Sequence, residues 1–436
     1  MRKISKISLV AAVAVAGFST ANAQPLEQAI KDVEVSGSVV YRYDNFHNKE
    51  KKDSFGNVTS DRDNTDANRY KIGLNLSSKV NDYVKFNSRF IVGDKTDFAS
   101  LSSKKDAAGD TNASVTLSQA YFGLTAIPNT VVNIGKQGLA TPYTVATDIN
   151  GNEQTGTGIL ALTTVGPVTG GLGWFNNTNL DKSTEINAGQ GLGVAKKTTT
   201  VDLATLKVSD TWNNTLEGGE DMYVATLQGD LDFVKLEAWY AGLHNTFNTY
   251  TLAATGKLDL ASDAKINLEA RYVELNLDNE VQKDLGLDSD KNSMFRLSAD
   301  GKFNIVNARL AYTQTGKKGG LTALDQDAKN ASLGWNLTSN GIANADHYQA
   351  ALGADILENL NFTMNYGNLK SKATDNVVFA DLQDIKAEEV YGQLTYKMSK
   401  NLNTYVRYGN YQEKINSTGE ETVDQNMGRL QVAYTF

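Results

Sequence analysis

The chain has 436 residues, a formal net charge of −8, no cysteine and a mean hydropathy of −0.37. The lack of cysteine excludes a small exported domain held together by disulfides. No stretch after residue 23 has the ~20 consecutive apolar residues of a membrane-spanning helix. The average hydropathy fits a soluble protein, but it also fits strands with one apolar and one polar face. The pattern along the chain therefore has to decide the class of protein.

Residues 1–23 have the three parts of a secretory signal peptide. Three basic residues come first, an apolar run follows at 7–18, and the segment ends on the small-residue motif Ala21-Asn22-Ala23. The apolar run is too short to span a bilayer, so we expect cleavage before Gln24. Cleavage leaves 413 residues with 39 basic and 50 acidic side chains, a net charge of −11.

Regular alternation of apolar and polar residues begins with "VEVSGSVVYRYD" at 33–44, the first predicted strand. Five later segments share one pattern, in which the fourth residue of the apolar face is always tyrosine: 234–240, 266–272, 306–312, 360–366 and 402–408. Tyrosine at one fixed depth suits the boundary between hydrocarbon and headgroups. A soluble β-sandwich or propeller, the alternative, gives tyrosine no reason to recur there. We therefore expect these strands to face lipid and to run in the same direction.

Eight short polar turns alternate with nine longer polar connections, which gives eighteen strands. The predicted fold is all-β: residues 24–436 form a closed antiparallel transmembrane β-barrel of eighteen strands, with sixteen as the less favoured number. We expect short periplasmic turns and long extracellular loops, the longest at 176–220. In lipid an open sheet edge has no hydrogen-bond partner, so the first strand should close against "RLQVAYTF" at 429–436.

A barrel of this width encloses water, and its inward-facing residues should be polar. Glu269, Arg271 and Arg309 are among the predicted lumen-facing side chains. Because the barrel closes, strands from both ends of the chain become neighbours, and their inward cations form one basic wall: Arg42, Lys71, Lys85, Arg89 and Arg407.

The third long connection, residues 138–156, lacks alternation and has glycines that allow it to fold inward. Its carboxylates, Asp148 and Glu153, would then face the basic wall. Carboxylates opposite cations in a narrow lumen create a transverse field, which is typical of a pore constriction. An ordinary surface loop with solvated charges is the alternative.

Short motifs add a resemblance to a known family. The stretch "PLEQAIKDVEVSGSVVYRYD" at 25–44, and "GKQ" at 135–137 followed by "TD" at 147–148 and "GTG" at 156–158, resemble the major outer membrane porins of campylobacters and related bacteria. The resemblance implies a trimeric general-diffusion porin that needs no cofactor. It also implies that the C-terminal strand, ending in Tyr434 and Phe436, is read by the barrel-assembly machinery.

The same resemblance allows for calcium near the constriction, with Asp148 and Glu153 as weak candidate ligands. Acidic runs at 61–66 and 288–292 also have alternate carboxylates, but they lack the glycine and terminal glutamate of an EF-hand loop. We interpret those runs as solvated loop charge.

We expect a channel in the outer membrane of a Gram-negative bacterium that passes ions and small hydrophilic solutes by passive diffusion. The net charge of −11 favours cations and the basic wall opposes them, so a weak cation preference is expected. An enzyme is not expected, because the three histidines, His47, His244 and His347, lie far apart, at predicted loop positions. Nothing indicates a nucleic-acid partner.

Two other functions remain open. The first is a substrate-selective channel, which an aromatic slide or a dense basic ladder would mark. Trp239 and Tyr405 are inward in the predicted strands but isolated. The second is surface adhesion through the long loops at 176–220 and 316–345, which match no family pattern. Within the first of these, "TTTVDLATLKV" at 198–208 could form an extra hairpin.

Overall fold

The computed structural model describes residues 33–52, 58–60, 62–93, 99–100, 114–180, 196–202, 207–213, 218–377 and 383–436. The predicted signal peptide and its cleavage site lie outside the described residues.

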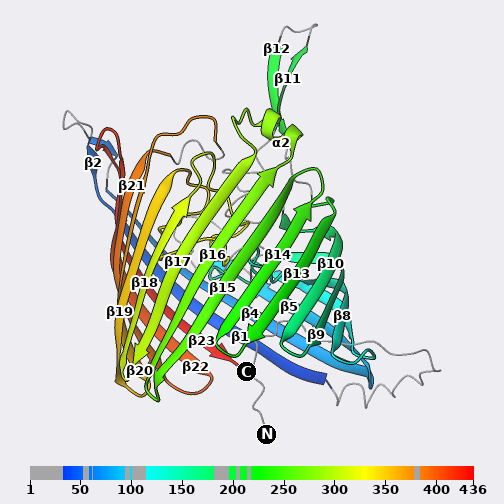
Figure 1. Ribbon diagram of the computed structural model, residues 1–436. Coiled ribbons are helices and arrows are strands. Elements are labelled where there is room, and N and C mark those ends of the chain that lie inside the picture. Colours follow the sequence, from blue (N-terminus) through cyan, green and yellow to red (C-terminus); the bar gives the residue numbers. More distant parts are fainter. Residues whose placement is uncertain are drawn as a thin grey trace.

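Eighteen strands close into one antiparallel barrel, as predicted, and Figure 1 shows them tilted around a continuous wall. They are β1 (Val33–Asn48), β4 (Asp63–Asn81), β5 (Val84–Gly93), β7 (Ser114–Leu124), β8 (Thr130–Gly138), β9 (Thr155–Val165), β10 (Val168–Thr178), β13 (Met222–Leu231), β14 (Val234–Leu243), β15 (Phe247–Ala261), β16 (Ala264–Leu277), β17 (Lys291–Phe303), β18 (Val306–Thr315), β19 (Ala345–Leu357), β20 (Leu360–Ser371), β21 (Ile385–Lys397), β22 (Leu402–Ile415) and β23 (Glu421–Thr435).

Smaller elements complete the described chain. The two-residue strand β6 (Ala99–Ser100) joins the barrel sheet beside β4, and β2 (Lys51–Lys52) pairs with β3 (Val58–Ser60). The hairpin of β11 (Lys196–Asp202) and β12 (Lys207–Asn213) forms a sheet of its own, where the sequence suggested one. The single described helix is α2 (Asn279–Asp284), and no helix of the described chain is long and apolar enough to cross a membrane.

The barrel closes between its first and last strands. β1 pairs with β23 in the register that sets Arg42 opposite Gln431. The ladder continues to the last residue, because Gly37 and Phe436 exchange both backbone hydrogen bonds, at 2.9 and 3.1 Å. Residue 37 has to be glycine here, since a Cβ would lie 2.3 Å from the Gly73 carbonyl oxygen and 2.8 Å from the Phe436 ring. The C-terminal aromatic therefore belongs to the closing strand.

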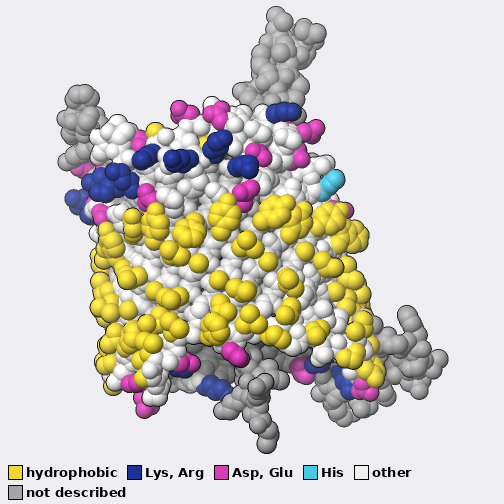
Figure 2. Space-filling model, in the orientation of Figure 1, with side chains coloured by type: hydrophobic (Ala, Val, Ile, Leu, Met, Phe, Trp, Pro, Cys, Tyr) yellow, Lys and Arg dark blue, Asp and Glu magenta, His cyan; other side chains and the backbone are white. Residues whose placement is uncertain are grey.

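The two faces of the strands follow the predicted alternation. On β16, Leu268 and Tyr272 are each 44% exposed on the outside, whereas Arg271 is 2% exposed inside. Figure 2 shows the outward apolar side chains as a band across the visible face of the barrel, bounded by charged residues at both rims. This band is the surface that contacts lipid.

The tyrosines of the five-segment pattern lie at one end of this band. Tyr240, Tyr272, Tyr312 and Tyr366 each donate a hydroxyl hydrogen bond to a polar side chain further toward the loops. Each ring thus lies against hydrocarbon while its hydroxyl reaches the polar layer. This arrangement is the one that the sequence pattern predicted.

The connections alternate between short and long, with two exceptions. Eight turns of two to five residues lie at the end of the barrel where Figure 1 places the C-terminus. At the opposite end, the β14–β15 connection has only three residues, and β22 and β23 continue as paired strands to residues 415 and 421. The sequence pattern had placed longer polar connections at 244–248 and 412–425; both are shorter in the structure, because paired strands extend beyond the apolar band.

Candidate channel constriction

The connection between β8 and β9, residues 139–154, folds into the barrel. Its turn is organised by Asp148, whose Oδ1 accepts hydrogen bonds from the backbone N–H groups of Asn150 (2.8 Å) and Asn152 (2.7 Å). The other carboxylate oxygen, Oδ2, accepts from Asn152 Nδ2 at 2.8 Å, and Gly151 adopts a positive φ of 80°. An aspartate that binds the amides of its own loop is a common way to fix a tight turn. Asp148 thus shapes the loop from within.

The rest of this loop lies directly against the basic wall. Arg89 Nε is 2.7 Å from Glu153 Oε1, and both side chains are largely buried. Arg42 donates to Asn150 Oδ1 at 3.1 Å and to a backbone carbonyl, and Lys71 donates to another backbone carbonyl of the loop. Three predicted wall cations from β1, β4 and β5 therefore hold the loop by contact. Whether they also select ions stays a prediction.

The other two predicted wall cations lie elsewhere. Lys85 pairs with Glu34 at 2.9 Å, near the short turn that precedes β5. The Arg407 guanidinium stacks on aromatic rings, 4.9 Å from the centroids of Trp335 and Tyr391 and 5.2 Å from that of Tyr405. The five predicted wall cations therefore do not form one group: three contact the inserted loop, and Lys85 and Arg407 lie at two other places. It also corrects the description of Tyr405 as isolated, because Trp335 comes from a distant loop that alternation could not place.

A second loop, residues 316–344 between β18 and β19, also folds inward, which the sequence did not predict. It meets the first loop through backbone hydrogen bonds from Leu324 N to Tyr143 O (2.8 Å) and from Asn330 N to Pro142 O (2.7 Å). Asp327 Oδ2 also accepts from the Ile149 N–H of the first loop at 3.1 Å.

Apolar residues of both loops pack in one buried cluster with the barrel wall: Leu139, Tyr143, Leu321 and Leu324 with Phe175, Met222, Leu243, Phe247 and Leu275. The two loops thus form one inserted body that narrows the lumen.

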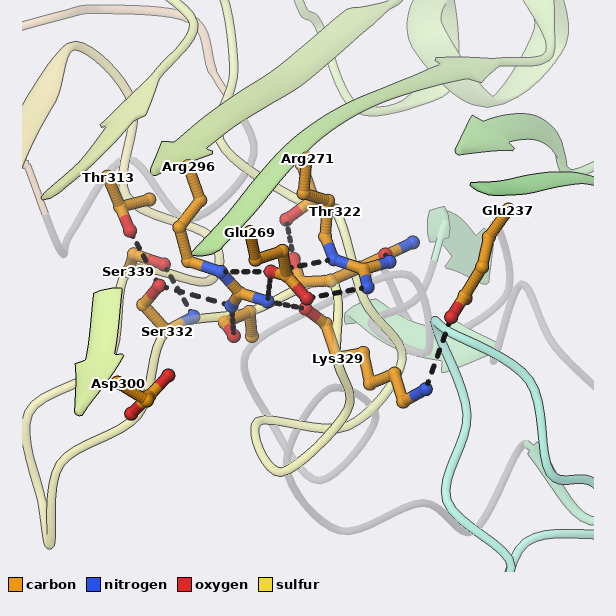
Figure 3. Close-up of polar contacts among 12 residues, drawn as sticks. Glu237, Glu269, Arg271, Arg296, Asp300, Thr313, Thr322, Lys329, Ser332 and Ser339 are labelled. Atoms are coloured by element: carbon orange, nitrogen blue, oxygen red, sulfur yellow. Dashed lines mark hydrogen bonds and ion pairs between the residues drawn. The ribbon is translucent and has the colours of Figure 1, made fainter. Parts of the chain in front are cut away.

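A charged cluster on β16 and β17 anchors the second loop (Figure 3). Glu269 accepts hydrogen bonds from Arg271 (3.1 Å) and Arg296 (2.7 Å). Arg296 in turn donates to the backbone carbonyls of Lys329 (2.8 Å) and Ala331 (2.7 Å). The guanidinium groups thus connect a wall carboxylate to loop backbone that lacks a strand partner. Sequence alternation had placed Glu269 and Arg271 inward, but it gave no reason to single out Arg296.

A second anchor is the carboxylate of Glu389 on β21, which is 1% exposed. It accepts the backbone N–H groups of Trp335 (2.6 Å), Asn336 and Leu337 (3.1 Å). Three convergent amides around one buried carboxylate satisfy groups that would otherwise be buried without partners. Glu389 therefore fixes the part of the loop that covers Arg407.

The more accessible charges in the lumen are also paired. Arg309 Nη1 is 2.7 Å from Asp300 Oδ1, and each side chain is about 40% exposed. A carboxylate oxygen of Glu237 lies 2.9 Å from the Lys235 amine and 3.9 Å from the amine of Lys329 at the loop tip. Opposite charges thus lie beside one another along this side of the lumen.

Burial also affects the protonation of charged groups on the second loop. It lowers the pKa of the Lys329 amine and raises the pKa of the Asp327 carboxyl.

The described residues do not fit the calcium site that the resemblance allowed for. Both oxygens of Asp148 are used by its own loop, and those of Glu153 by Arg89 and Ser118. No group of three or more His, Asp or Glu side chains among the described residues could hold a metal ion. A hard cation needs several free oxygens. The carboxylates of this loop already accept hydrogen bonds from amide groups, a serine hydroxyl and an arginine.

Two of the three histidines were placed wrongly by the sequence. His47 lies on β1 and His347 on β19, whereas only His244 lies in a turn. His347 is completely buried, beneath the second inward loop. The three remain far apart along the described barrel wall.

Comparison with known proteins identifies the family. The sequence model described as Campylobacter major outer membrane protein matches residues 1–436, the whole chain. The chain belongs to this family. It is thus an outer-membrane porin, as the short motifs and the strand pattern predicted. A comparison with curated protein sequences gives no match.

Solved structures show the same barrel in more distantly related proteins. OccK5 (OpdH) of Pseudomonas aeruginosa is 14% identical, with a TM-score of 0.64, 93% of this chain covered and 98% of that chain. OprD of the same species is 15% identical, with a TM-score of 0.61 and coverage of 92% and 93%. OpdK of Pseudomonas aeruginosa, solved with vanillate, is 14% identical, with a TM-score of 0.63 and coverage of 92% and 98%. At this identity the likeness concerns the fold, and porin family and fold together indicate a channel rather than an enzyme.

Proposed function

We propose that this porin is a general-diffusion channel for ions and small hydrophilic solutes, with a weak preference for cations. The observation that carries the proposal is the pairing of charges around the two inserted loops. Arg89 with Glu153 and Arg309 with Asp300 form one-to-one pairs at 2.7 Å, and Glu269 offsets one of the two arginines that contact it at 2.7 and 3.1 Å. A lumen in which most cations lie beside carboxylates creates only a small net potential. The net charge of −11 on the mature chain then gives cations a small advantage.

The inserted loops support a limit on solute size. They meet each other and the wall through direct contacts, so the path for solutes has to run beside them. A solute that passes such a constriction loses part of its hydration and samples the local charges. We expect small ions and hydrophilic solutes to pass, and folded proteins or large oligosaccharides to be excluded.

The test is reconstitution of the purified mature protein in a planar bilayer. We expect stepwise conductance and, in a salt gradient, a small reversal potential on the cation side. The absence of steps would overturn the channel, whereas strong anion selectivity would overturn only the charge argument.

A matched pair of variants tests whether the paired charges influence the ions that pass. Asp300→Asn should shift the reversal potential toward anions, and Arg309→Gln should shift it toward cations by a similar amount, because each leaves one exposed partner uncompensated. If neither variant changes the reversal potential, the Arg309 pair lies away from the ion path.

One observation favours a second candidate, a substrate-selective channel. Arg407 lies against three aromatic rings, and the Arg429 guanidinium lies 5.6 Å from the Trp335 ring centroid. Cationic groups among aromatic rings suit an aromatic carboxylate, and the structure of OpdK contains vanillate. Vanillate should then block ion current saturably in the wild type but not in Arg407→Gln. Equal currents with and without vanillate would reject this candidate.

We further propose that the porin assembles as a homotrimer and that its C-terminal strand is recognised by the barrel-assembly machinery. Membership of the family supports both proposals. Light scattering of the detergent-solubilised protein should give three times the mass of the mature chain, and a monomeric mass would contradict the trimer.

A further inference from the structure

His347 is a buried imidazole without a polar partner. It is the third residue of β19 and points into the barrel, since its neighbour Tyr348 is exposed on the outer face. Neither ring nitrogen has a hydrogen-bond partner among the described residues. An imidazolium here would be a buried charge whose N–H groups lack acceptors, which is strongly unfavourable. The ring is therefore neutral as long as the residues around it stay in place.

The second inserted loop covers this ring. In the strand register, His347 lies opposite Thr313 of β18 and Leu369 of β20. Leu369 packs in one buried cluster with Leu337 of the loop. These neighbours are uncharged, and residues 333–338 of the loop contain no charged side chain. Because the strands are held by the barrel ladder, the loop is the part of this cover that can move and let water reach the ring.

The carboxylate that anchors the loop lies beside the same ring. A Cβ on residue 367 would lie 3.8 Å from His347 Nε2, 3.9 Å from Glu389 Cβ and 3.1 Å from Leu337 Cδ2. Residue 367 is glycine, so it has no side chain to separate the imidazole from Glu389. The Glu389 carboxylate accepts the three backbone N–H groups of residues 335–337. The loop anchor and the neutral imidazole are therefore neighbours.

Other charged groups on the neighbouring elements have partners of their own. Asp346, on the same strand, accepts from a tyrosine hydroxyl on the outer face. Arg296 on β17 donates to a wall carboxylate and to loop carbonyls, and Arg407 on β22 lies against the Tyr391 ring and donates to a glutamine. Among the described residues, Glu389 is thus the carboxylate toward which a charged His347 would be drawn.

We propose that His347 and Glu389 form an acid-sensitive latch for the second inserted loop. At neutral pH the imidazole is neutral and Glu389 holds the loop amides. When residues 333–338 leave the wall, the imidazole becomes accessible and takes up a proton with the ordinary pKa of a histidine, about 6.5. The imidazolium then attracts the Glu389 carboxylate away from the amides, which keeps the loop released.

The direction of the response follows from where the proton binds. The released state takes up a proton that the closed state excludes, so release is favoured as the pH falls below about 6.5 and disfavoured above it. The latch is independent of which solutes the channel passes, because it concerns only the position of the loop.

Amide hydrogen exchange of the folded mature porin in detergent tests the latch at pH 7 and pH 5. After correction for the intrinsic pH dependence of exchange, the opening equilibrium of residues 333–338 should rise about 25-fold from pH 7 to pH 5, the factor for one group of pKa about 6.5 that is protonated only in the released state. Protection of β19 and β20 should stay unchanged, which distinguishes loop release from unfolding of the barrel. Single-channel current should become noisier and larger over the same range. Equal protection of residues 333–338 at the two pH values would overturn the proposal.

The variant His347→Gln retains a polar side chain that cannot take up a proton. It should conduct as the wild type does at pH 7 and lose the pH dependence of exchange in residues 333–338. The matched control is His244→Gln, which removes an exposed histidine in the turn between β14 and β15 and should keep the full response. The same response in His347→Gln would assign it to another group and contradict the latch. If His347→Gln does not assemble, the exchange of the wild type at the two pH values decides.

Discussion

The environment of each side chain in this barrel depends on the side of the wall to which it points. Of two adjacent residues on one strand, one faces lipid and the other faces the water-filled lumen, since successive side chains point to opposite faces of the sheet. On β16, Leu268 is outward and exposed to lipid, whereas Asn267 points to the water-filled side, beside Asp300 in the register. The same substitution at these two positions should therefore have different consequences.

Leu268→Arg should destabilise the barrel by ~2–4 kcal/mol, because it places a charge in the hydrocarbon near the middle of the bilayer. Asn267→Arg should fold with wild-type stability and should change ion selectivity. Urea unfolding in lipid vesicles measures the first effect, and reversal potentials measure the second. Equal losses of stability would show that the assignment of faces is wrong.

At the scale of elements, the inserted loops depend on a few buried anchors. Loop 316–344 has little regular structure, so its backbone amides need partners from the wall. Glu389 satisfies three of them at once. A loop held in this way should detach as a unit when its anchor is removed.

Glu389→Ala should release residues 333–338 from the wall, because three buried amides would lose a charged acceptor, at about 1.5–3 kcal/mol for a hydrogen bond to a charged group. We expect faster amide hydrogen exchange in this segment and a noisier, larger single-channel current. The control is Glu388→Ala, one residue away on the outer face, which should leave both unchanged. Unaltered exchange in Glu389→Ala would show that other contacts hold the loop.

The second element is the closing strand β23, whose last residue takes part in closing the barrel. Phe436 completes the ladder with Gly37, and its ring stacks on Tyr434 with 5.8 Å between centroids. Removing this residue leaves Gly37 without its partner at the edge where the barrel closes.

Deletion of Phe436 should lower the assembled fraction severalfold, measured as heat-modifiable protein on a gel, while channels that do assemble keep their conductance. Thr435→Ala retains the terminal aromatic and the backbone ladder, so it should assemble normally. Normal assembly without Phe436 would contradict a role for the terminal residue in closure.

The whole molecule consists of a closed barrel and an appended hairpin. β11 and β12 pair only with each other among the described strands, and Figure 1 shows them projecting beyond the barrel rim. The two ends of the segment meet at the wall, because Thr178 N donates to Gly218 O at 2.9 Å. The barrel does not depend on the hairpin for closure.

Replacing residues 181–217 by a short glycine–serine linker should therefore leave folding and conductance unchanged. The same variant tests surface adhesion, the alternative left open by the sequence, since loss of cell binding would assign that role to this segment. A conductance altered by more than about twofold would show instead that the segment contributes to the path of ions.

Sequence alone determined the parts of this porin that depend on local periodicity. Alternation with tyrosine at one depth predicted the barrel and the facing of residues such as Leu268 and Arg271, and the count of short and long connections predicted the strand number. These features follow from the local pleat of each strand, which repeats every two residues. The inward fold of residues 138–156 was also predicted, because that segment breaks the pattern between two clear strands.

Only the tertiary structure decided how the lumen is filled. Arg296 and Glu389 act on backbone groups of a loop that is distant from them in sequence, and such groups leave no mark in the sequence pattern. For the same reason the ring of Trp335 could not be placed beside Arg407. Contacts between segments that are distant in sequence, not composition, therefore determine the constriction.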